Sequence, residues 1–334
     1  MEAVIREFMV KHNVPGLSVA VAKDDRIVFA QGFGFADKDA GDPVTVRSRF
    51  RIASISKPIT AVAVLRLVED GGLRLSDRVF GAGGLLGTTY GTRPYKQYIE
   101  AVTVENLLAH TSGGWQNDAN DPMFQRPEMD HSQLIAWTLD NAVLEHAPGA
   151  NYAYSNFGYC LLGRIIEELT SERYENAVRR LVLQPSGVQD LAIARNKAED
   201  RQQDEVVYYG NEDDTPYEPN VTRMDSHGGW IASAEDLVRF AIHVNGFPQE
   251  PDILQPDTLR AMSTGSTANP GYGLGWAVNE AGSWWHGGSL PGSATIMLRT
   301  ASGLCWAALA NTRSPGLGAE LDKMMWAAVS LLKE

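Results

Sequence analysis

A single lysine interrupts an apolar stretch of the chain. Lys57 is the only charged residue among the twelve positions from Ser54 to Leu65. Pro58 follows it, and because proline is well tolerated in the first turn of a helix, the stretch predicts a helix that begins near Ser54 and continues to Asp70. Burying an ammonium group in apolar surroundings is costly, so a lysine at this position needs a specific role.

The spacing of Ser54 and Lys57 suggests that role. Residues three apart share one face of a helix. Burial lowers the pKa of a lysine, so Lys57 is a plausible base for the Ser54 hydroxyl, and the helix N-terminus favours developing negative charge. The alternative is that Ser54 caps the helix while Lys57 extends to solvent. The apolar context favours a nucleophile with its base.

Two further patterns occur later in the chain. The pattern Y-x-N occurs at Tyr154, Tyr174 and Tyr209, and the pattern alone does not choose among them. His286-Gly287-Gly288 precedes Ser289 in a region of short apolar runs. Glycines at such a site leave the edge of a strand open to a substrate, although a simple glycine turn between two strands is the alternative.

On these residues the sequence resembles the serine β-lactamase and penicillin-binding-protein superfamily, on its class C, DD-peptidase and family VIII esterase side. The resemblance runs from about Pro15 to Asn311 and implies a mixed α/β fold, in which an antiparallel sheet flanked by terminal helices carries an inserted, mainly helical lobe. The segment Pro148–Tyr159 is similar to the turn that precedes a buried helix in this family. The resemblance therefore selects Tyr154 among the three Y-x-N matches.

The resemblance also implies roles for individual residues. Tyr154 would be a phenol that shuttles protons, and a neighbouring ammonium group is expected to lower its pKa. Asn156 would hold Lys57 and the substrate.

Further roles fall on the glycine-containing strand. His286 stands where many relatives have the lysine of K-T-G, and it would bind substrate together with Gly288. The backbone N–H groups of Ser54 and Ser289 would form the oxyanion hole. His110, within the similar stretch Leu107–Gly114, is expected to be structural.

Strand-like segments at both ends of the chain, with helical segments between them, predict the domain organisation. Residues 1–50 together with 250–334 are expected to form an α/β lobe, and residues 51–249 a mainly helical lobe, within one β-lactamase-related domain. Leu17–Ala22 and Ile27–Phe33 read as a hairpin at the start of this sheet.

Composition and motif searches exclude several classes of function. The net charge of −12 argues against nucleic acid as a partner. The spacing of histidines and cysteines gives no metal site, and nucleotide-binding glycine motifs are missing, so no cofactor is expected. No window of about 18 apolar residues predicts a membrane span. Residues 1–7 resemble a helix start rather than a signal peptide, which leaves the compartment open between the cytoplasm and a trimmed exported protein; the oligomeric state is open too.

The charge pattern bears on the substrate. Recognition of a terminal carboxylate usually needs a cation, yet the sequence has no lysine or arginine between Arg260 and Arg299. This pattern favours neutral esters over β-lactams and peptides. Aromatic residues next to the motifs suggest an aromatic-walled pocket, with core packing as the alternative for each: Trp115, Tyr152, Trp230, Trp284 and Trp285.

The sequence thus predicts a serine hydrolase that cleaves a small-molecule ester, amide or β-lactam through an acyl-enzyme on Ser54, with an esterase-like preference. One alternative is a D-alanyl-D-alanine peptidase or a weak class C-type β-lactamase, and an acyltransferase differs only in what attacks the acyl-enzyme. An alternative of another class is a non-catalytic sensor that binds penicillin or another acyl donor.

Overall fold

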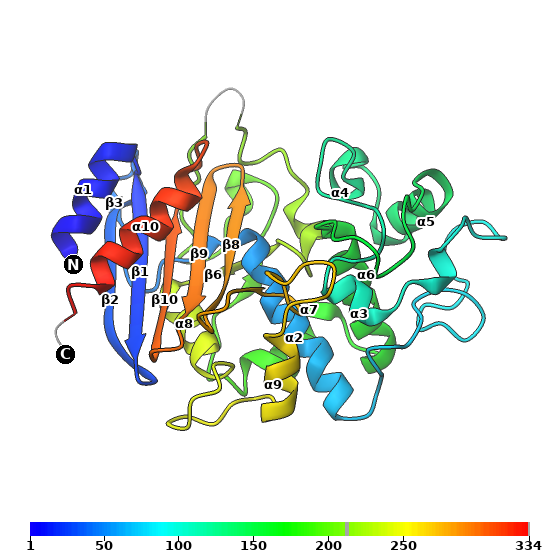
Figure 1. Cartoon of the computed structure of the whole chain (residues 1–334). Helices are drawn as coiled ribbons and strands as arrows, with labels where there is room; N and C mark the ends of the chain where they lie inside the picture. Colours follow the sequence, from blue (N-terminus) through cyan, green and yellow to red (C-terminus); the bar gives the residue numbers. More distant parts are fainter. Residues whose placement is uncertain (211–213, 333–334) are drawn as a thin grey trace.

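The computed structural model describes residues 1–210 and 214–332 (Figure 1). A seven-stranded sheet, in which every neighbouring pair is antiparallel, has the order β3-β2-β1-β10-β9-β8-β7. Its strands are β1 (Gly16–Lys23), β2 (Arg26–Asp37), β3 (Asp42–Pro43), β7 (Ala277–Val278), β8 (Trp284–Leu290), β9 (Ser293–Arg299) and β10 (Leu304–Ala310). Strand β1 pairs with β2 as the predicted hairpin and with β10 near the other end of the chain.

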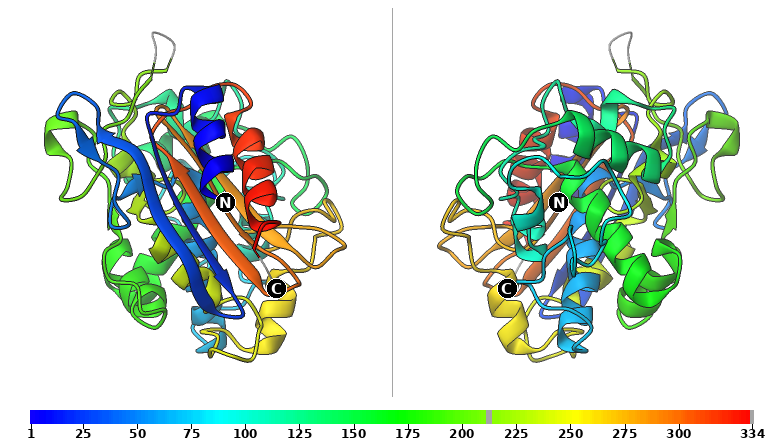
Figure 2. Two further views of the ribbon diagram at one scale, coloured as in Figure 1. Left: turned by 90° about the vertical axis from the view of Figure 1, so that its left-hand side faces the viewer. Right: turned by 90° about the vertical axis from the view of Figure 1, so that its right-hand side faces the viewer.

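Both faces of this sheet are covered. Strand β1 lies in its interior and is buried along nearly its whole length, which explains its continuous apolar run. Helices α1 (Glu2–His12) and α10 (Leu317–Val329) pack on one face (Figure 2). Helix α8 (Ala234–Ile242) and the helical part of the molecule cover the other.

The helical part is built around α2 (Ser56–Glu69), whose residues from Ser56 to Leu65 are all buried. A short 3-10 turn, η1 (Ala53–Ile55), precedes α2, so the regular helix starts two residues after the predicted Ser54. The remaining helices are α3 (Val104–Leu108), α4 (Pro122–Gln125), α5 (His131–Asn141), α6 (Asn156–Thr170), α7 (Tyr174–Val178) and α9 (Pro256–Met262).

Shorter elements complete the chain. A second sheet has the order β4-β6-β5, formed by β4 (Phe50–Arg51), β6 (Trp230–Ala232) and β5 (Ala192–Ile193). Short helical turns are η2 (Ile99–Ala101), the π-helical η3 (Arg179–Leu183), η4 (Ala198–Asp200) and η5 (Val221–Met224). Within the described residues, no helix has the length and apolar character needed to cross a membrane.

The mixed α/β architecture agrees with the fold class expected from the sequence. The strands of the large sheet come from residues 16–43 and 277–310, and most helices come from the chain between them. The lobe boundaries at residues 50/51 and 249/250 stay predictions.

Candidate active site

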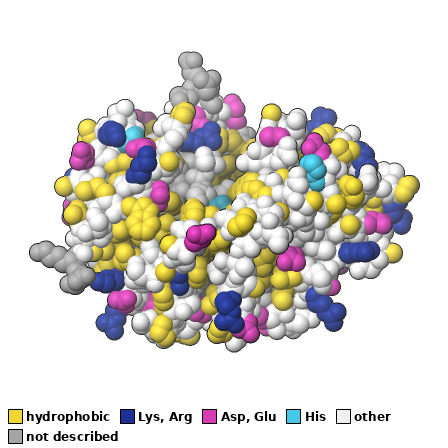
Figure 3. Space-filling model, in the orientation of Figure 1, with side chains coloured by type: hydrophobic (Ala, Val, Ile, Leu, Met, Phe, Trp, Pro, Cys, Tyr) yellow, Lys and Arg dark blue, Asp and Glu magenta, His cyan; other side chains and the backbone are white. Residues whose placement is uncertain are grey.

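Ser54 lies in the turn η1, where the sheet meets the helical part. Ser54 is partly exposed, whereas every other residue from Phe50 to Leu65 is buried. Ala53 directly before it has φ 49°, a left-handed conformation that residues with a Cβ atom rarely adopt. Backbone strain of this kind often occurs at functional sites. In the space-filling view, the surface is hollowed between the two parts of the molecule (Figure 3).

Lys57 lies one helical turn after Ser54 and is fully buried. Its Nζ is 3.0 Å from Ser54 Oγ, 2.7 Å from Asn156 Oδ1 and 3.0 Å from the carbonyl oxygen of His227. Desolvation lowers the pKa of Lys57 from 10.5 to about 7, although the negative charge of Asp121 acts in the opposite direction. A substantial fraction of the amine is therefore neutral near pH 7 and able to accept the Ser54 proton.

Tyr154 completes a cluster with these two residues. Lys57 Nζ lies 4.7 Å from the centre of the Tyr154 ring, and the Tyr154 phenol lies near enough to Ser54 for a hydrogen-bonding interaction with it to act on the Tyr154 pKa. The expectation that its pKa would be lowered is wrong: burial raises the pKa of Tyr154, and this desolvation outweighs the hydrogen bond from Ser54. Tyr154 is accordingly a protonated phenol near neutral pH.

The other two Y-x-N tyrosines lie elsewhere. The Tyr174 hydroxyl is 2.6 Å from Thr60 Oγ1 and accepts a hydrogen bond from the Trp230 indole. The Tyr209 hydroxyl accepts a hydrogen bond from the Lys38 backbone N–H. Of the three tyrosines, Tyr154 is the one that the fold brings to Ser54 and Lys57.

Asn156 is the first residue of α6, and its side chain connects Lys57 with a carboxylate that the sequence analysis missed. While its Oδ1 accepts from Lys57, its Nδ2 donates to Asp121 Oδ2 at 2.7 Å. Asp121 precedes Pro122, and in sequence this pair signals an ordinary helix start. The residue does cap α4, because its Oδ1 accepts the Met123 N–H at 2.9 Å.

Strand β8 passes directly beside the nucleophile turn, and Gly288 makes this approach possible. A Cβ atom at Gly288 would overlap the Ile52 carbonyl oxygen and lie 3.1 Å from the Ala53 Cβ. Backbone cannot yield to such an overlap, so only glycine fits. Gly288 and Ser289 therefore lie next to Ser54, but the oxyanion role of Ser289 stays a prediction.

His286 is held in a buried chain of hydrogen bonds that the sequence analysis did not foresee. Its Nδ1 donates to the Gly287 carbonyl at 2.7 Å, so its Nε2 accepts from the Tyr272 hydroxyl at 3.1 Å. Tyr272 in turn accepts from His110 Nε2 at 3.2 Å, because His110 Nδ1 accepts the Ser155 N–H. These directions follow from the two backbone partners at the ends of the chain.

Both ring nitrogens of His286 are thus occupied by the protein itself. Desolvation lowers the pKa of His286 to about 3, with a smaller effect of the Lys57 charge in the same direction. The imidazole is neutral near pH 7 and has no free N–H for a substrate carboxylate. The expected contact between His286 and substrate therefore stays a prediction without support from this geometry.

The aromatic-walled pocket stays a prediction, and the five aromatic residues named for it lie in different surroundings. Tyr152 lies beside the cluster, with its ring centre 5.6 Å from that of Tyr272. The four tryptophans pack elsewhere: Trp115 on Phe157, Trp230 on Tyr174, Trp284 on Arg299, and Trp285 with the core beneath α10. Along β8, alternate residues face opposite sides, so Trp285 lies on the face opposite to that of His286.

A cation does reach the end of β8, and it comes from the chain after Arg299. A pocket is lined by Gly288, Ser289, Asp214 and Arg313, together with the residues that lead into α10. Arg313 forms an ion pair with the buried Asp214, which also accepts the Gly292 N–H at 2.9 Å. A cation is therefore present at this end of the strand although none lies between Arg260 and Arg299, and the Asp214 carboxylate neutralises it.

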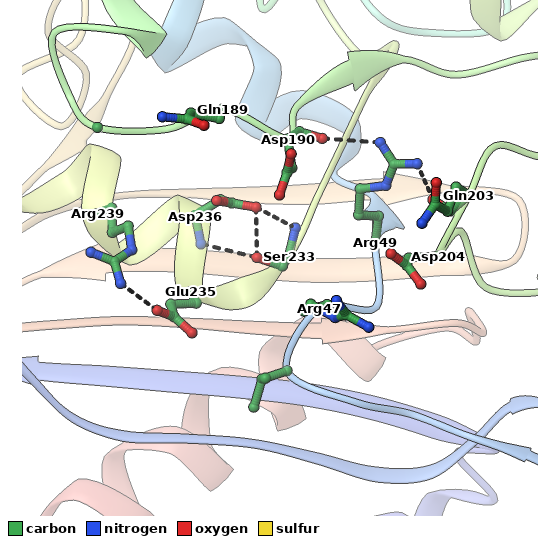
Figure 4. A pocket seen from close by; sticks show the side chains of 12 residues that line it. Arg47, Arg49, Gln189, Asp190, Gln203, Asp204, Ser233, Glu235, Asp236 and Arg239 are labelled. Carbon is green, nitrogen blue, oxygen red and sulfur yellow. Dashed lines mark hydrogen bonds and ion pairs between the residues drawn. The ribbon is translucent and has the colours of Figure 1, made fainter.

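A separate polar pocket lies near the N-terminus of α8 (Figure 4). Its side chains mainly bind protein groups: Arg49 donates to the carbonyls of Asp190 and Gln203, and Ser233 and Asp236 cap α8. None of the predicted site residues lines it, so it forms no part of the cluster around Ser54.

Comparison with known proteins decides the family. The family described as Beta-lactamase matches residues 1–330. The chain belongs to the beta-lactamase family. Both the resemblance and the fold class expected from the sequence are therefore confirmed, and the superfamily is one of serine hydrolases.

Individual relatives are distant. Protein flp of Staphylococcus aureus (strain MRSA252) is 25% identical over 304 residues, which cover 89% of this chain and 59% of that protein. Esterase EstB of Burkholderia gladioli is 28% identical over 344 residues, covering 87% of this chain and 83% of EstB. The octameric penicillin-binding protein homologue from Pyrococcus abyssi superimposes with a TM-score of 0.76 at 26% identity, covering 100% of this chain and 77% of that chain.

Proposed function

We propose that this protein is a serine hydrolase that forms an acyl-enzyme on Ser54. The observation that carries the proposal is the 3.0 Å contact between Ser54 Oγ and the fully buried Lys57 amine. An amine whose pKa is lowered to about 7 is matched to proton transfer at neutral pH. Lys57 is the general base in this proposal and Tyr154 is the proton donor.

The reaction would proceed in two balanced halves. Lys57 Nζ accepts the Ser54 hydroxyl proton while Oγ attacks the acyl carbon, and the backbone N–H groups of Ser54 and Ser289 receive the negative charge. Tyr154 donates its proton to the departing alcohol oxygen, and the Lys57 ammonium restores that proton. In the second half, Lys57 Nζ accepts a proton from a water molecule while the water oxygen attacks the acyl carbon, and the Lys57 ammonium returns that proton to Ser54 Oγ as the acid leaves.

Charge at the site supports a preference for neutral esters. His286 is a neutral imidazole without a free N–H, and Asp214 neutralises Arg313. Neither residue supplies the net positive charge that recognition of a carboxylate requires. A relative named as an esterase agrees with this preference. The second candidate, a D-alanyl-D-alanine peptidase or weak β-lactamase, draws support from the likeness to a penicillin-binding protein homologue.

The test measures the turnover of p-nitrophenyl butyrate and nitrocefin, and labelling by a fluorescent penicillin, for the wild-type protein and for Ser54→Ala. Ester hydrolysis should fall by at least about 10³-fold in Ser54→Ala, because the nucleophile is lost. Ser56→Ala is the matched control, since Ser56 is a buried serine two residues away whose hydroxyl faces the Trp230 backbone N–H. Ester turnover that survives in Ser54→Ala would refute the proposal, whereas stoichiometric labelling without turnover would indicate the sensor.

Asp214→Asn should change the substrate preference. Asparagine keeps an oxygen for the Gly292 N–H but removes the charge that neutralises Arg313. We expect kcat/KM for a substrate with a carboxylate, such as nitrocefin, to rise about tenfold relative to p-nitrophenyl butyrate. Asp204→Asn, a change at the separate polar pocket, is the control. An unchanged ratio of the two kcat/KM values would show that Arg313 does not face the substrate.

A further inference from the structure

Asp121 is a buried carboxylate that the proposed reaction does not use. It has no exposed surface, and its two oxygens have different partners. Oδ1 accepts the Met123 N–H and Oδ2 accepts one Asn156 Nδ2–H. Desolvation raises the pKa of Asp121 to about 6, and the hydrogen bond from Asn156, the one from Met123 and the Lys57 charge oppose this rise. At neutral pH the group is therefore mainly the anion, whose oxygens both accept.

The carboxylate determines which way the Asn156 amide points. An amide has one accepting oxygen and one donating nitrogen. Because Asp121 only accepts, it binds Nδ2 and leaves Oδ1 for Lys57 Nζ at 2.7 Å. A reversed amide would direct N–H groups at the Lys57 ammonium and would place two oxygens against each other at Asp121. Either contact is unfavourable in a buried site.

We propose that Asp121 is a positioning residue, which fixes the Asn156 amide with its oxygen toward Lys57 and so sets the pH above which Lys57 acts as a base. The inference rests on the proposed function of Lys57. The negative charge of Asp121 and the oriented amide oxygen both stabilise the ammonium form, so both keep a proton on Lys57 that burial alone would expel.

Other titratable groups around Lys57 are neutral near pH 7 or lie farther from it. The tyrosine rings on either side remain protonated because burial raises their pKa values, and burial lowers the pKa values of the three nearby histidines. These groups are Tyr154, Tyr159, His110, His227 and His286. Asp118 is the additional carboxylate that acts on Asp121, and it is fully exposed to solvent. Asp121 is thus the buried anion of this cluster.

Asp121→Asn provides the first test. The new amide at position 121 would have one oxygen in place of two, and because Met123 and Asn156 donate to different oxygens of the carboxylate, this one oxygen cannot reach both donors. Either the α4 cap breaks or the Asn156 amide reverses, and in both cases the negative charge is lost. In the pH profile of kcat/KM for p-nitrophenyl butyrate, we expect the midpoint of the acid limb to fall by about one pH unit. The plateau should fall about tenfold, because the base is weaker and less well held.

The exchanged pair, Asp121→Asn with Asn156→Asp, makes the test directional. The carboxylate, now at position 156, would accept from Lys57 and from the amide at position 121. The oxygen of that amide would accept the Met123 N–H, so every hydrogen bond has a partner. The carboxylate would then contact Lys57 directly, and the acid-limb midpoint should rise above that of the wild type. This variant also keeps the proposal testable if the single variant does not fold, which thermal unfolding would show.

Glu128→Gln is the control for loss of a charge, because Glu128 lies exposed between α4 and α5. In Glu128→Gln, the midpoint of the acid limb of the kcat/KM profile should equal that of the wild type. A folded Asp121→Asn with the wild-type midpoint, or an exchanged pair whose midpoint moves downward, would overturn the inference. Ester hydrolysis that persists in Ser54→Ala would instead refute the proposed function, so the two failures are distinguishable.

Discussion

Lys57→Met should lose at least about 10³-fold in ester hydrolysis while the protein stays folded. Methionine fills a similar buried volume but cannot accept the Ser54 proton, so the hydroxyl has no base. Single-turnover hydrolysis of p-nitrophenyl butyrate measures this step, because the release of nitrophenol reports acylation. A wild-type burst rate in Lys57→Met would exclude Lys57 as the base.

The same substitution should change the pH dependence of stability. Burial lowers the pKa of Lys57 from 10.5 to about 7, so between these values the unfolded chain binds a proton that the folded protein does not. The free energy of unfolding of the wild type therefore rises with pH in this window, by up to about 1.4 kcal/mol per pH unit. Lys57→Met lacks this contribution.

Urea denaturation at pH 7 and pH 10 tests the sign. Relative to Lys57→Met, the wild type should gain roughly 3 kcal/mol between these two values. The absolute difference at one pH is less informative, since methionine leaves the oxygens of Asn156 and His227 without their donor. Lys38→Met, a change at a lysine outside the buried cluster, should follow the wild type at both pH values. If the free energy of unfolding changed by the same amount between pH 7 and pH 10 in the wild type and in Lys57→Met, the lowered pKa of Lys57 would be contradicted.

The sequence was most informative where the site is local. Ser54 and Lys57 lie within one helical turn, so helix geometry alone brings their side chains together. Tyr154 and Asn156 likewise lie at the start of one helix, α6. In both places a few neighbouring residues determine the arrangement, and the family resemblance selects among the alternatives.

Long-range contacts could not be predicted in this way. The chain from His110 through Tyr272 to His286 joins three segments, and its hydrogen-bond directions depend on two backbone groups at its ends. Arg313 reaches the end of β8 only because the segment before α10 returns to the sheet. Arg313 lies outside the interval from Arg260 to Arg299, so the charge pattern of that interval does not reveal it.

The sign of the Tyr154 pKa shift shows a related limit. A neighbouring ammonium group lowers the pKa of a phenol, and this effect can be inferred from a motif. Burial raises it, and burial depends on everything that packs around the ring. In this structure desolvation dominates, since Tyr154 lies within the aromatic and histidine cluster around Lys57. The two opposing effects can be weighed only once the fold is known.

Asp225→Ala should destabilise the protein by about 3–5 kcal/mol, because it leaves a buried guanidinium without its main partner. Asp225 Oδ2 accepts from Arg164 Nη2 at 2.6 Å, and both side chains are nearly inaccessible. Burial alone would raise the pKa of Asp225, but the Arg164 charge and the His131 ring, whose Nε2 lies 3.6 Å from Asp225 Oδ1, hold it well below its usual range. Glu167, more exposed and 2.8 Å from Arg164, is a weaker partner.

The pH dependence of this difference has a defined sign. A carboxylate with a lowered pKa stabilises the fold above its unfolded value of about 4, and the contribution is lost as pH falls below that value. The gap between wild type and Asp225→Ala in urea denaturation should therefore be constant from about pH 5 to pH 8 and narrow near pH 3. Asp257→Ala is the control, since the pair of Asp257 and Arg260 is exposed and its loss should hardly change stability.

Activity should fall together with stability in Asp225→Ala. The two residues that follow Asp225 present their carbonyl oxygens to α2: Ser226 accepts from Thr60, and His227 accepts from Lys57. Loss of the Arg164 ion pair would loosen this segment and remove one of the contacts that hold the Lys57 amine beside Ser54. We expect kcat/KM for p-nitrophenyl butyrate to fall about tenfold at a temperature where the variant is still folded. Full activity with a loss of more than about 3 kcal/mol in stability would show that the ion pair supports the fold without positioning the base.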